Sequence, residues 1–353
     1  MGCAGSVVAL AAVGLLPASR AEAQLGDRIK INGYASVEFE KQTGDEGEGD
    51  PNGSFDSDGV DLVINALVTD RLRVGTDLTW EHGAATEDGR GNVAVEYAFM
   101  EYFVRDWLKL RAGKMFVPFG LYNEIHTAKP LFLSVKEPFA TDKTDKLGSP
   151  VRFFPRWGTG LAALGSGQIA GRDYDYTLQL TNGESDTVNP FEEDDNTAKA
   201  LAARFRYHPA KGLAIGASAY RDELSPDGAV GRTTQVSWSL HGSWEGSRAG
   251  IEAMYVQGSL EPDAQPRLSR LGMEAMVWGK LGRLRPYLRY EYHDPDTDLD
   301  DDQAHLLLGG VNVRIDEGFY LKAELDRTTS GDQNGKLEGV AFNEFKASLA
   351  VGF

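Results

Sequence analysis

Long segments in which every second residue is apolar are the feature that most constrains this chain. In the final segment, Phe345, Leu349 and Phe353 alternate with polar or small residues. A period of two is typical of a strand with one dry face and one wet face. The alternation is least regular at 151–165. About sixteen such segments occur, near 29–40, 59–69, 71–82, 92–105, 107–117, 151–165, 172–182, 197–208, 212–222, 231–245, 247–259, 268–281, 283–294, 303–315, 318–328 and 343–353.

The length and spacing of these segments indicate a membrane barrel. Strands of about ten residues, at ~3.3 Å per residue and a tilt of ~40°, cross the apolar band of an outer membrane, whereas strands in soluble proteins average about five or six residues. The connections alternate between short ones, such as Asp70, and long ones, such as 41–58 and 118–150. Short turns alternate with long external loops in outer-membrane barrels. We therefore predict an all-β, transmembrane antiparallel β-barrel of about 16 strands, with the last strand paired to the first.

The first residues of the chain indicate export. An apolar stretch at 7–18 is too short to span a bilayer, and Ala21-Glu22-Ala23 follows it as a cleavage site of the A-x-A type. We interpret residues 1–23 as a signal peptide and 24–353 as one outer-membrane barrel domain that is exported through the periplasm. The single cysteine, Cys3, lies within the predicted signal peptide, which is compatible with an oxidising envelope.

Two stretches resemble a known family. The terminal alternation that closes on Phe353 resembles the outer-membrane assembly signal of Gram-negative porins, and 111–139 is similar to the stretch that leads into the third external loop of porins related to the phosphate-selective O/P type. The resemblance implies a water-filled channel in the outer membrane and a homotrimer. Its implied partners are outer-membrane lipid, lipopolysaccharide and, through the Phe353 strand, the assembly machinery. We expect no nucleic-acid partner and no cofactor.

The resemblance also implies that the third external loop folds into the barrel and narrows it. The link 118–150 is longer than connectors usually are, and such loops tend to be functional. Its apolar residues suit packing against an inner wall, and it is the most basic of the long links. The candidate constriction residues are Lys129, Lys136, Arg152, Arg156, His126 and Glu124.

Basic residues on the polar faces gather near the predicted short turns, whereas Glu38, Glu40, Glu81 and Glu291 lie near the predicted loops. This arrangement predicts a path for anions such as phosphate. The alternative is that a polar wall simply needs both signs of charge, and Asp173 and Asp175 depart from the trend. The basic lumen candidates are Arg71, Arg73, Lys109, Arg111, Arg204, Arg206, Arg285 and Arg314.

The net charge of −17 is concentrated in three predicted external loops, 41–59, 183–196 and 294–302. One interpretation is that these loops are solvated and coordinate divalent cations together with lipopolysaccharide phosphates. A sharper hypothesis is a Ca²⁺ site, because carboxylates are suitable hard oxygen ligands. Its candidate ligands are Asp294, Asp296, Asp298 and Asp300.

Enzyme signatures are weak in this sequence. The histidines show no metal-ligand spacing, and there is no G-x-S-x-G motif. We therefore expect no enzyme, but a porin for passive diffusion of small hydrophilic solutes or ions. Two alternatives stay open. One is a structural or adhesin-like barrel with a plugged lumen, and the other is a barrel-embedded hydrolase that uses Ser239, His241 or His305 with an acid.

Overall fold

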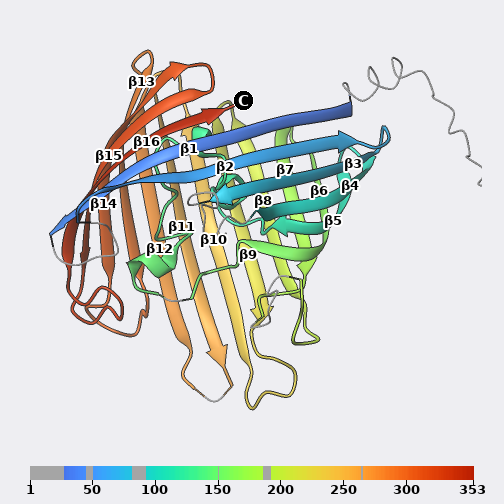
Figure 1. Ribbon diagram of the computed structural model, residues 1–353. Coiled ribbons are helices and arrows are strands. Elements are labelled where there is room, and N and C mark those ends of the chain that lie inside the picture. The colour runs from blue at the N-terminus through green and yellow to red at the C-terminus, as the bar shows by residue number, and fades with distance from the viewer. Residues whose placement is uncertain (1–27, 45–50, 82–92, 150, 186–191, 264) are drawn as a thin grey trace, which may run out of the picture.

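The computed structural model describes residues 28–44, 51–81, 93–149, 151–185, 192–263 and 265–353, so the predicted signal peptide 1–23 lies outside the described residues. Within them, sixteen strands form a closed barrel (Figure 1). The strands are β1 (Ile29–Gly44), β2 (Ser54–Leu67), β3 (Leu72–Glu81), β4 (Ala94–Arg105), β5 (Leu108–Phe116), β6 (Trp157–Ile169), β7 (Arg172–Thr181), β8 (Ala200–Ala210), β9 (Leu213–Glu223), β10 (Thr233–Glu245), β11 (Ala249–Pro262), β12 (Leu268–Gly279), β13 (Leu284–Asp294), β14 (Ala304–Asp316), β15 (Phe319–Ser330) and β16 (Ala341–Gly352).

Each strand pairs antiparallel with its neighbours in sequence, and β1 pairs with β16. This last pairing removes both sheet edges, which would otherwise present unpaired backbone groups. The prediction of a closed antiparallel barrel of about 16 strands is therefore confirmed. Some boundaries differ from the expected ones. The second strand was expected at 59–69, but β2 begins at Ser54, and the sixth was expected at 151–165, but β6 begins at Trp157. Pro155 lies just before β6, and proline cannot donate a hydrogen bond to a strand ladder.

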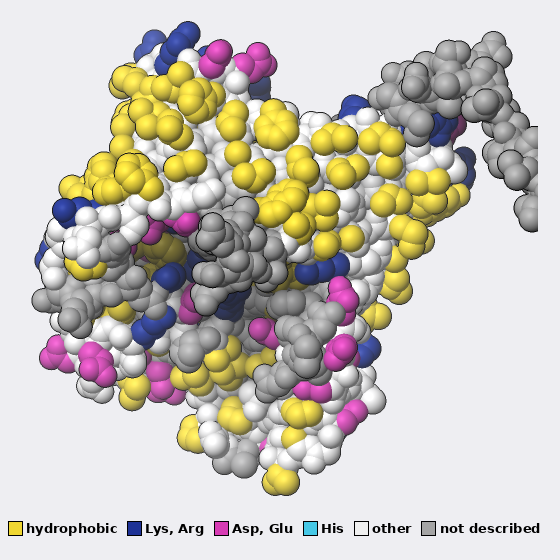
Figure 2. Space-filling model, in the orientation of Figure 1, with side chains coloured by type: hydrophobic (Ala, Val, Ile, Leu, Met, Phe, Trp, Pro, Cys, Tyr) yellow, Lys and Arg dark blue, Asp and Glu magenta, His cyan; other side chains and the backbone are white. Residues whose placement is uncertain are grey.

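Side chains alternate between an apolar outer face and a polar lumen face, because successive residues of a strand point to opposite sides. On β7, Leu178 is 52% exposed, whereas its neighbour Gln179 is 5% exposed. On β15, Leu325 is 63% exposed, whereas Glu324 is buried. Figure 2 shows hydrophobic side chains spread over the visible wall. The outer face thus suits a hydrocarbon environment and the inner face suits water and ions.

Short turns gather at the end of the barrel that holds the C-terminus. Ala170 and Gly171 join β6 to β7 with φ values of 52° and 73°. Two central residues with positive φ match the tight hairpin turns whose twist fits that of the flanking strands. No helix among the described residues is long and apolar enough to cross a membrane.

The connection between β5 and β6, residues 117–156, is called the inner loop here. It contains three short 3-10 helices, η1 (Asn123–Ile125), η2 (Lys129–Leu131) and η3 (Thr144–Leu147). Its two ends pack together on the inner faces of β8, β9 and β11. Figure 1 shows this loop as the green segment within the barrel. This apolar cluster comprises Val117, Phe119, Phe153, Phe154, Ala200, Ala202, Tyr220, Met254 and Val256.

Candidate functional site

Four consecutive strands, β12 to β15, each direct one hydrogen-bond donor from the lumen face to the inner loop. Arg289 Nη1 donates to Ser134 Oγ at 2.7 Å, and Lys322 Nζ donates to the carbonyls of Lys129 at 2.6 Å and Ser134 at 2.9 Å. A buried carbonyl without a partner is costly, so these donors fix the backbone of the loop. The four donors are Arg270, Arg289, Asn312 and Lys322.

The two lysines predicted to line the constriction are paired with carboxylates of β1 and β2. Lys129 Nζ lies 3.3 Å from Asp58 Oδ2, and Lys136 Nζ lies 3.2 Å from Asp58 Oδ1. Lys136 also contacts Glu38, and its Nζ lies 3.3 Å from Glu40 Oε1. Burial lowers the pKa of Lys136, but the three carboxylates outweigh it and hold that pKa well above its ordinary value. Both lysines are therefore charged, but their field is largely balanced by the wall.

His126 and Arg156 lie among acids at the base of the inner loop. His126 Nε2 is 3.2 Å from Glu96 Oε2, and Arg156 Nη2 is 2.5 Å from Glu137 Oε1. Burial, with help from Arg156, lowers the pKa of His126 below its ordinary value despite Glu96. Burial raises the pKa of Glu137, but Lys143 and Arg156 reverse the effect and bring it well below the ordinary range.

The remaining constriction candidates, Glu124 and Arg152, contact strands β8 and β10. Glu124 pairs with Arg204 of β8, which was itself predicted as a lumen residue. The carbonyl of Arg152 accepts a hydrogen bond from Gln235 Nε2 of β10 at 2.5 Å. The structure therefore brings all six candidates into the inner loop or its base, and five of them have charged partners on their side chains.

The basic lumen candidates divide into paired and unpaired groups. Arg73 and Arg111 share one carboxylate, that of Glu101, at 2.7 Å and 2.6 Å. Arg206 Nε lies 2.9 Å from Asp175 Oδ1, so the acid that departed from the predicted trend is the partner of a base. Two further candidates, Lys109 and Arg71, lie nearer the short turns: Lys109 Nζ is 5.2 Å from the centre of the Phe103 ring, and Arg71 is exposed.

Arg285 and Arg314 line a cavity of about 270 Å³ on the short-turn side of the inner loop. Arg283 joins them there, although it was not among the predicted lumen residues. The only sequence feature that could have identified Arg283 as a lumen residue was its position in a short turn, near the other basic candidates. The opposite wall of this cavity is the stretch 130–133 of the inner loop.

The inner loop separates this cavity from one on the long-loop side. That second cavity, of about 250 Å³, mixes both signs of charge, with four lysines and three acids in its lining. The charged lining residues are Lys136, Lys143, Lys146, Lys346, Glu40, Asp56 and Glu344. The lumen is thus charged on both sides of the inner loop, and the charged residues that line the 270 Å³ cavity are all arginines.

Two of the proposed Ca²⁺ ligands, Asp294 and Asp296, each use one carboxylate oxygen for a hydrogen bond within the protein. Asp296 Oδ1 accepts a hydrogen bond from the amide of Asp298 at 3.1 Å, and Asp294 Oδ2 accepts one from Tyr292 Oη at 3.0 Å. Nowhere in the described part of the chain are three or more histidine, cysteine, aspartate or glutamate residues grouped so that they could hold a metal ion. The calcium hypothesis therefore gains no support.

The candidate hydrolase residues are only partly brought together. Ser239 Oγ lies 3.4 Å from His241 Nδ1 on the lumen face of β10. Within the described residues, His241 Nε2 has no hydrogen-bond partner, so no acid orients the pair. His305 is exposed on β14 and its Nδ1 lies 2.8 Å from Tyr290 Oη.

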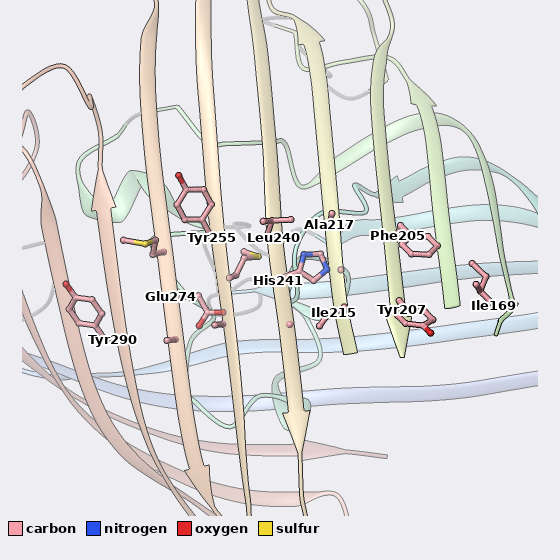
Figure 3. Close-up of a pocket in the computed structure, with 16 residues that line it drawn as sticks. Ile169, Phe205, Tyr207, Ile215, Ala217, Leu240, His241, Tyr255, Glu274 and Tyr290 are labelled. Carbon is pink, nitrogen blue, oxygen red and sulfur yellow. The ribbon is translucent and has the colours of Figure 1, made fainter. Parts of the chain in front are cut away.

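A hollow of about 1010 Å³ lies on the outer wall over β8 to β13 (Figure 3). Outward-facing Phe205, Leu240 and Tyr290 are all 43% exposed or more, and the buried His241 and Glu274 complete the lining from below. Its floor forms where small residues are in register on β10, β11 and β12: Gly242 opposes Ala253, which opposes Ala275.

No protein-family model matches the chain. An uncharacterised protein of Aquifex aeolicus is 29% identical over 128 residues, which cover 36% of this chain and 28% of the relative. The fold is similar to that of an anion-selective porin from Comamonas acidovorans, with a TM-score of 0.66, 11% identity and coverage of 92% of this chain and 99% of the porin.

Two further solved structures are similar. The outer-membrane channel DcaP of Acinetobacter baumannii has a TM-score of 0.62 at 13% identity, covering 92% of this chain and 97% of that chain. OmpT of Vibrio cholerae in its trimer form, an outer-membrane protein, has a TM-score of 0.56 at 13% identity, covering 93% of this chain and 100% of that chain. At these identities the likeness shows the fold, a porin-like barrel.

Proposed function

We propose that this chain is an outer-membrane porin that allows passive diffusion of small hydrophilic solutes or ions. The observation that carries the proposal is a closed barrel with an apolar outer face, a charged lumen and an anchored inner loop with cavities on both sides. Because all backbone groups of a closed barrel pair within the sheet, such a structure can reside in a membrane. The similarity to outer-membrane porins and channels supports the same function.

The inner loop acts as the size filter in this proposal. Its backbone is held by side-chain donors of β12 to β15, and its lysines are held by carboxylates of β1 and β2, so several strands fix its position. A fixed loop gives a constriction of constant width. Rings of charged side chains on either side then favour one sign of ion.

A preference for anions is the finer part of the proposal. Lys129 and Lys136 are balanced by acids and contribute little net charge, which differs from their expected role as a free basic ring. The support comes instead from Arg283, Arg285 and Arg314 on the short-turn side. The fold similarity to an anion-selective porin agrees with this preference. Phosphate is one anion that such a path would accept.

The proposed partners follow from the same membrane location. The apolar wall contacts outer-membrane lipid, the acidic loops meet lipopolysaccharide and its divalent cations, and the Phe353 strand engages the assembly machinery after removal of residues 1–23. A homotrimer is part of the proposal, and the trimer form of Vibrio cholerae OmpT supports it. The bare Ser239–His241 pair gives no support to an enzymatic role.

Conductance of the purified, folded protein in planar bilayers tests this proposal. We expect discrete channel openings, and a reversal potential under a salt gradient that indicates anion preference. Changing Arg285 and Arg314 to Glu should shift the reversal potential toward cations, whereas changing Asp298 and Asp300 to Asn should shift it much less, because exposed loop charges are screened within ~8 Å at ~0.15 M salt. Folded protein without any current would instead favour the plugged structural barrel.

A further inference from the structure

Three guanidinium groups, those of Arg283, Arg285 and Arg314, surround the short-turn cavity, and among the described residues no carboxylate lines it. Arg285 Nη1 is 3.8 Å from Glu245 Oε1, but Lys280 pairs with that same oxygen. Arg314 has no side-chain hydrogen bond or ion pair within the described part of the chain. The cavity therefore has an excess of positive charge that the protein itself does not neutralise.

The facing wall of the cavity is apolar. Pro130, Leu131, Phe132 and Leu133 of the inner loop form it, and Leu131 is 62% exposed. The exposed Leu131 side chain thus gives the cavity an apolar surface that a ligand can contact. Leu131–Leu133 also line a neighbouring cavity of about 350 Å³, which shares Arg285 but includes Glu245 and Glu252. Only the uncharged end of an elongated ligand therefore suits that second cavity.

The wall is held in place and does not depend on a ligand for its shape. Asn312 Nδ2 donates to the carbonyl of Phe132 at 3.2 Å, and Lys322 Nζ donates to that of Lys129 at 2.6 Å. Tyr320, also in the lining, brings a phenol close to the arginines. A preformed site with one cationic side and one apolar side binds a ligand at a lower entropic cost than a flexible one.

The geometry points to a binding site for an organic carboxylate between Arg283, Arg285, Arg314 and the stretch 130–133. The carboxylate pairs with the planar guanidinium groups, which match its two oxygens, and its apolar body lies against Leu131 and Pro130. The inference rests on the proposed channel function. It identifies organic carboxylates as the class of solute that binds on the short-turn side of the inner loop. An inorganic oxyanion uses the arginines but not the apolar wall.

Equilibrium binding to the full-length protein folded in detergent tests this inference without any measurement of current. Isothermal titration calorimetry at low salt compares benzoate, acetate and inorganic phosphate as probes. We expect benzoate to bind more tightly than acetate and phosphate. The double variant Arg285→Gln/Arg314→Gln should weaken benzoate binding about tenfold or more, because charge-assisted hydrogen bonds are lost. Leu131→Ser should remove most of the preference for benzoate over acetate.

Arg248→Gln is the matched control, because Arg248 is also an arginine at the short-turn end but does not line the cavity. Unchanged benzoate affinity in the double variant, or an equal loss in the Arg248 variant, would overturn the inference. Phosphate binding as tight as benzoate binding would also overturn it. If the protein conducts current but does not bind benzoate, only this inference is contradicted. If it binds benzoate but conducts no current, only the proposed channel function is contradicted.

Discussion

The amide of Gly33 donates to the carbonyl of Phe353 at 2.9 Å, and the amide of Phe353 donates to the carbonyl of Gly33 at 3.0 Å. This exchange of two bonds completes the contact between β1 and the end of β16, where an antiparallel pair shares both its hydrogen bonds. A Cβ added to Gly33 would overlap the Phe353 ring. Glycine at this position therefore lets the terminal aromatic ring lie flat across the closing strands.

Replacing Gly33 with Val should impair barrel closure, because the new side chain displaces the Phe353 ring and strains the last pairing. We expect a smaller fraction of the heat-modifiable, folded form on cold gels. Phe353→Asp should give the same result in newly made protein. Gly309→Ala is the control, since its Cβ would meet only Leu288 Cδ1, at 3.8 Å. Equal folded fractions for Gly33→Val and the control would contradict the prediction.

Leu178→Arg should destabilise the barrel by about 2–4 kcal/mol, because it places a charge on the lipid-facing wall. Leu178 is 52% exposed on the outer face of β7. The comparison is Ser243→Arg, at a lumen position of β10 that lines a cavity, where the new charge meets water. Urea unfolding in lipid vesicles measures both variants. A similar loss of unfolding free energy in Leu178→Arg and Ser243→Arg would mean that the lipid-facing and lumen-facing sides of the strands are misassigned.

Lys136→Met should loosen the inner loop, because it leaves the buried Glu38 without its ion-pair partner and Asp58 with Lys129 alone. Loss of one partner from a buried ion pair costs on the order of 3 kcal/mol. We expect faster hydrogen exchange and proteolysis within 117–156. Adding Glu38→Gln should restore part of the protection, because fewer unpaired charges remain. Lys211→Met, at an exposed short turn, is the control. Unaltered exchange in Lys136→Met would exclude this pair as an anchor.

Asp142 makes the stability of the inner loop depend on pH. Both of its carboxylate oxygens are buried without a hydrogen-bond partner among the described residues. Burial raises its pKa to about 7, and Glu137 adds to the effect while Arg156 opposes it. Since the folded state holds this proton more tightly than the unfolded state, its stabilising effect is complete below about pH 4 and is lost as the pH rises toward about 7.

Asp142→Asn should therefore remove one source of that pH dependence. We expect the variant to gain stability relative to the unaltered protein between pH 5 and pH 8, as measured by urea unfolding in vesicles. Asp298→Asn, in an exposed loop, should track the unaltered protein across the same range. A constant difference between Asp142→Asn and the unaltered protein at all pH values would show that Asp142 keeps its charge in the folded state.

The sequence by itself determined the barrel. Lipid outside and water inside force a period of two on every strand, so Leu178 and Gln179 could be assigned to opposite faces from their order alone. The exception was 151–156, where apolar residues such as Phe153 and Phe154 fill the lumen instead of facing lipid. A buried loop and a membrane strand can have the same composition, and alternation separates them poorly over few residues.

Only the tertiary structure decided which charges meet. Asp58 is far from Lys129 and Lys136 in the chain, and no local pattern couples β2 to the inner loop. The sequence could therefore identify those lysines as loop residues but not show that the wall balances them. Likewise, Arg285 and Arg314 come from separate strands, and they line one cavity with Arg283 because β13 pairs with β14 beside a turn. Local periodicity fixes the face of a residue, whereas its partners depend on contacts between distant parts of the chain.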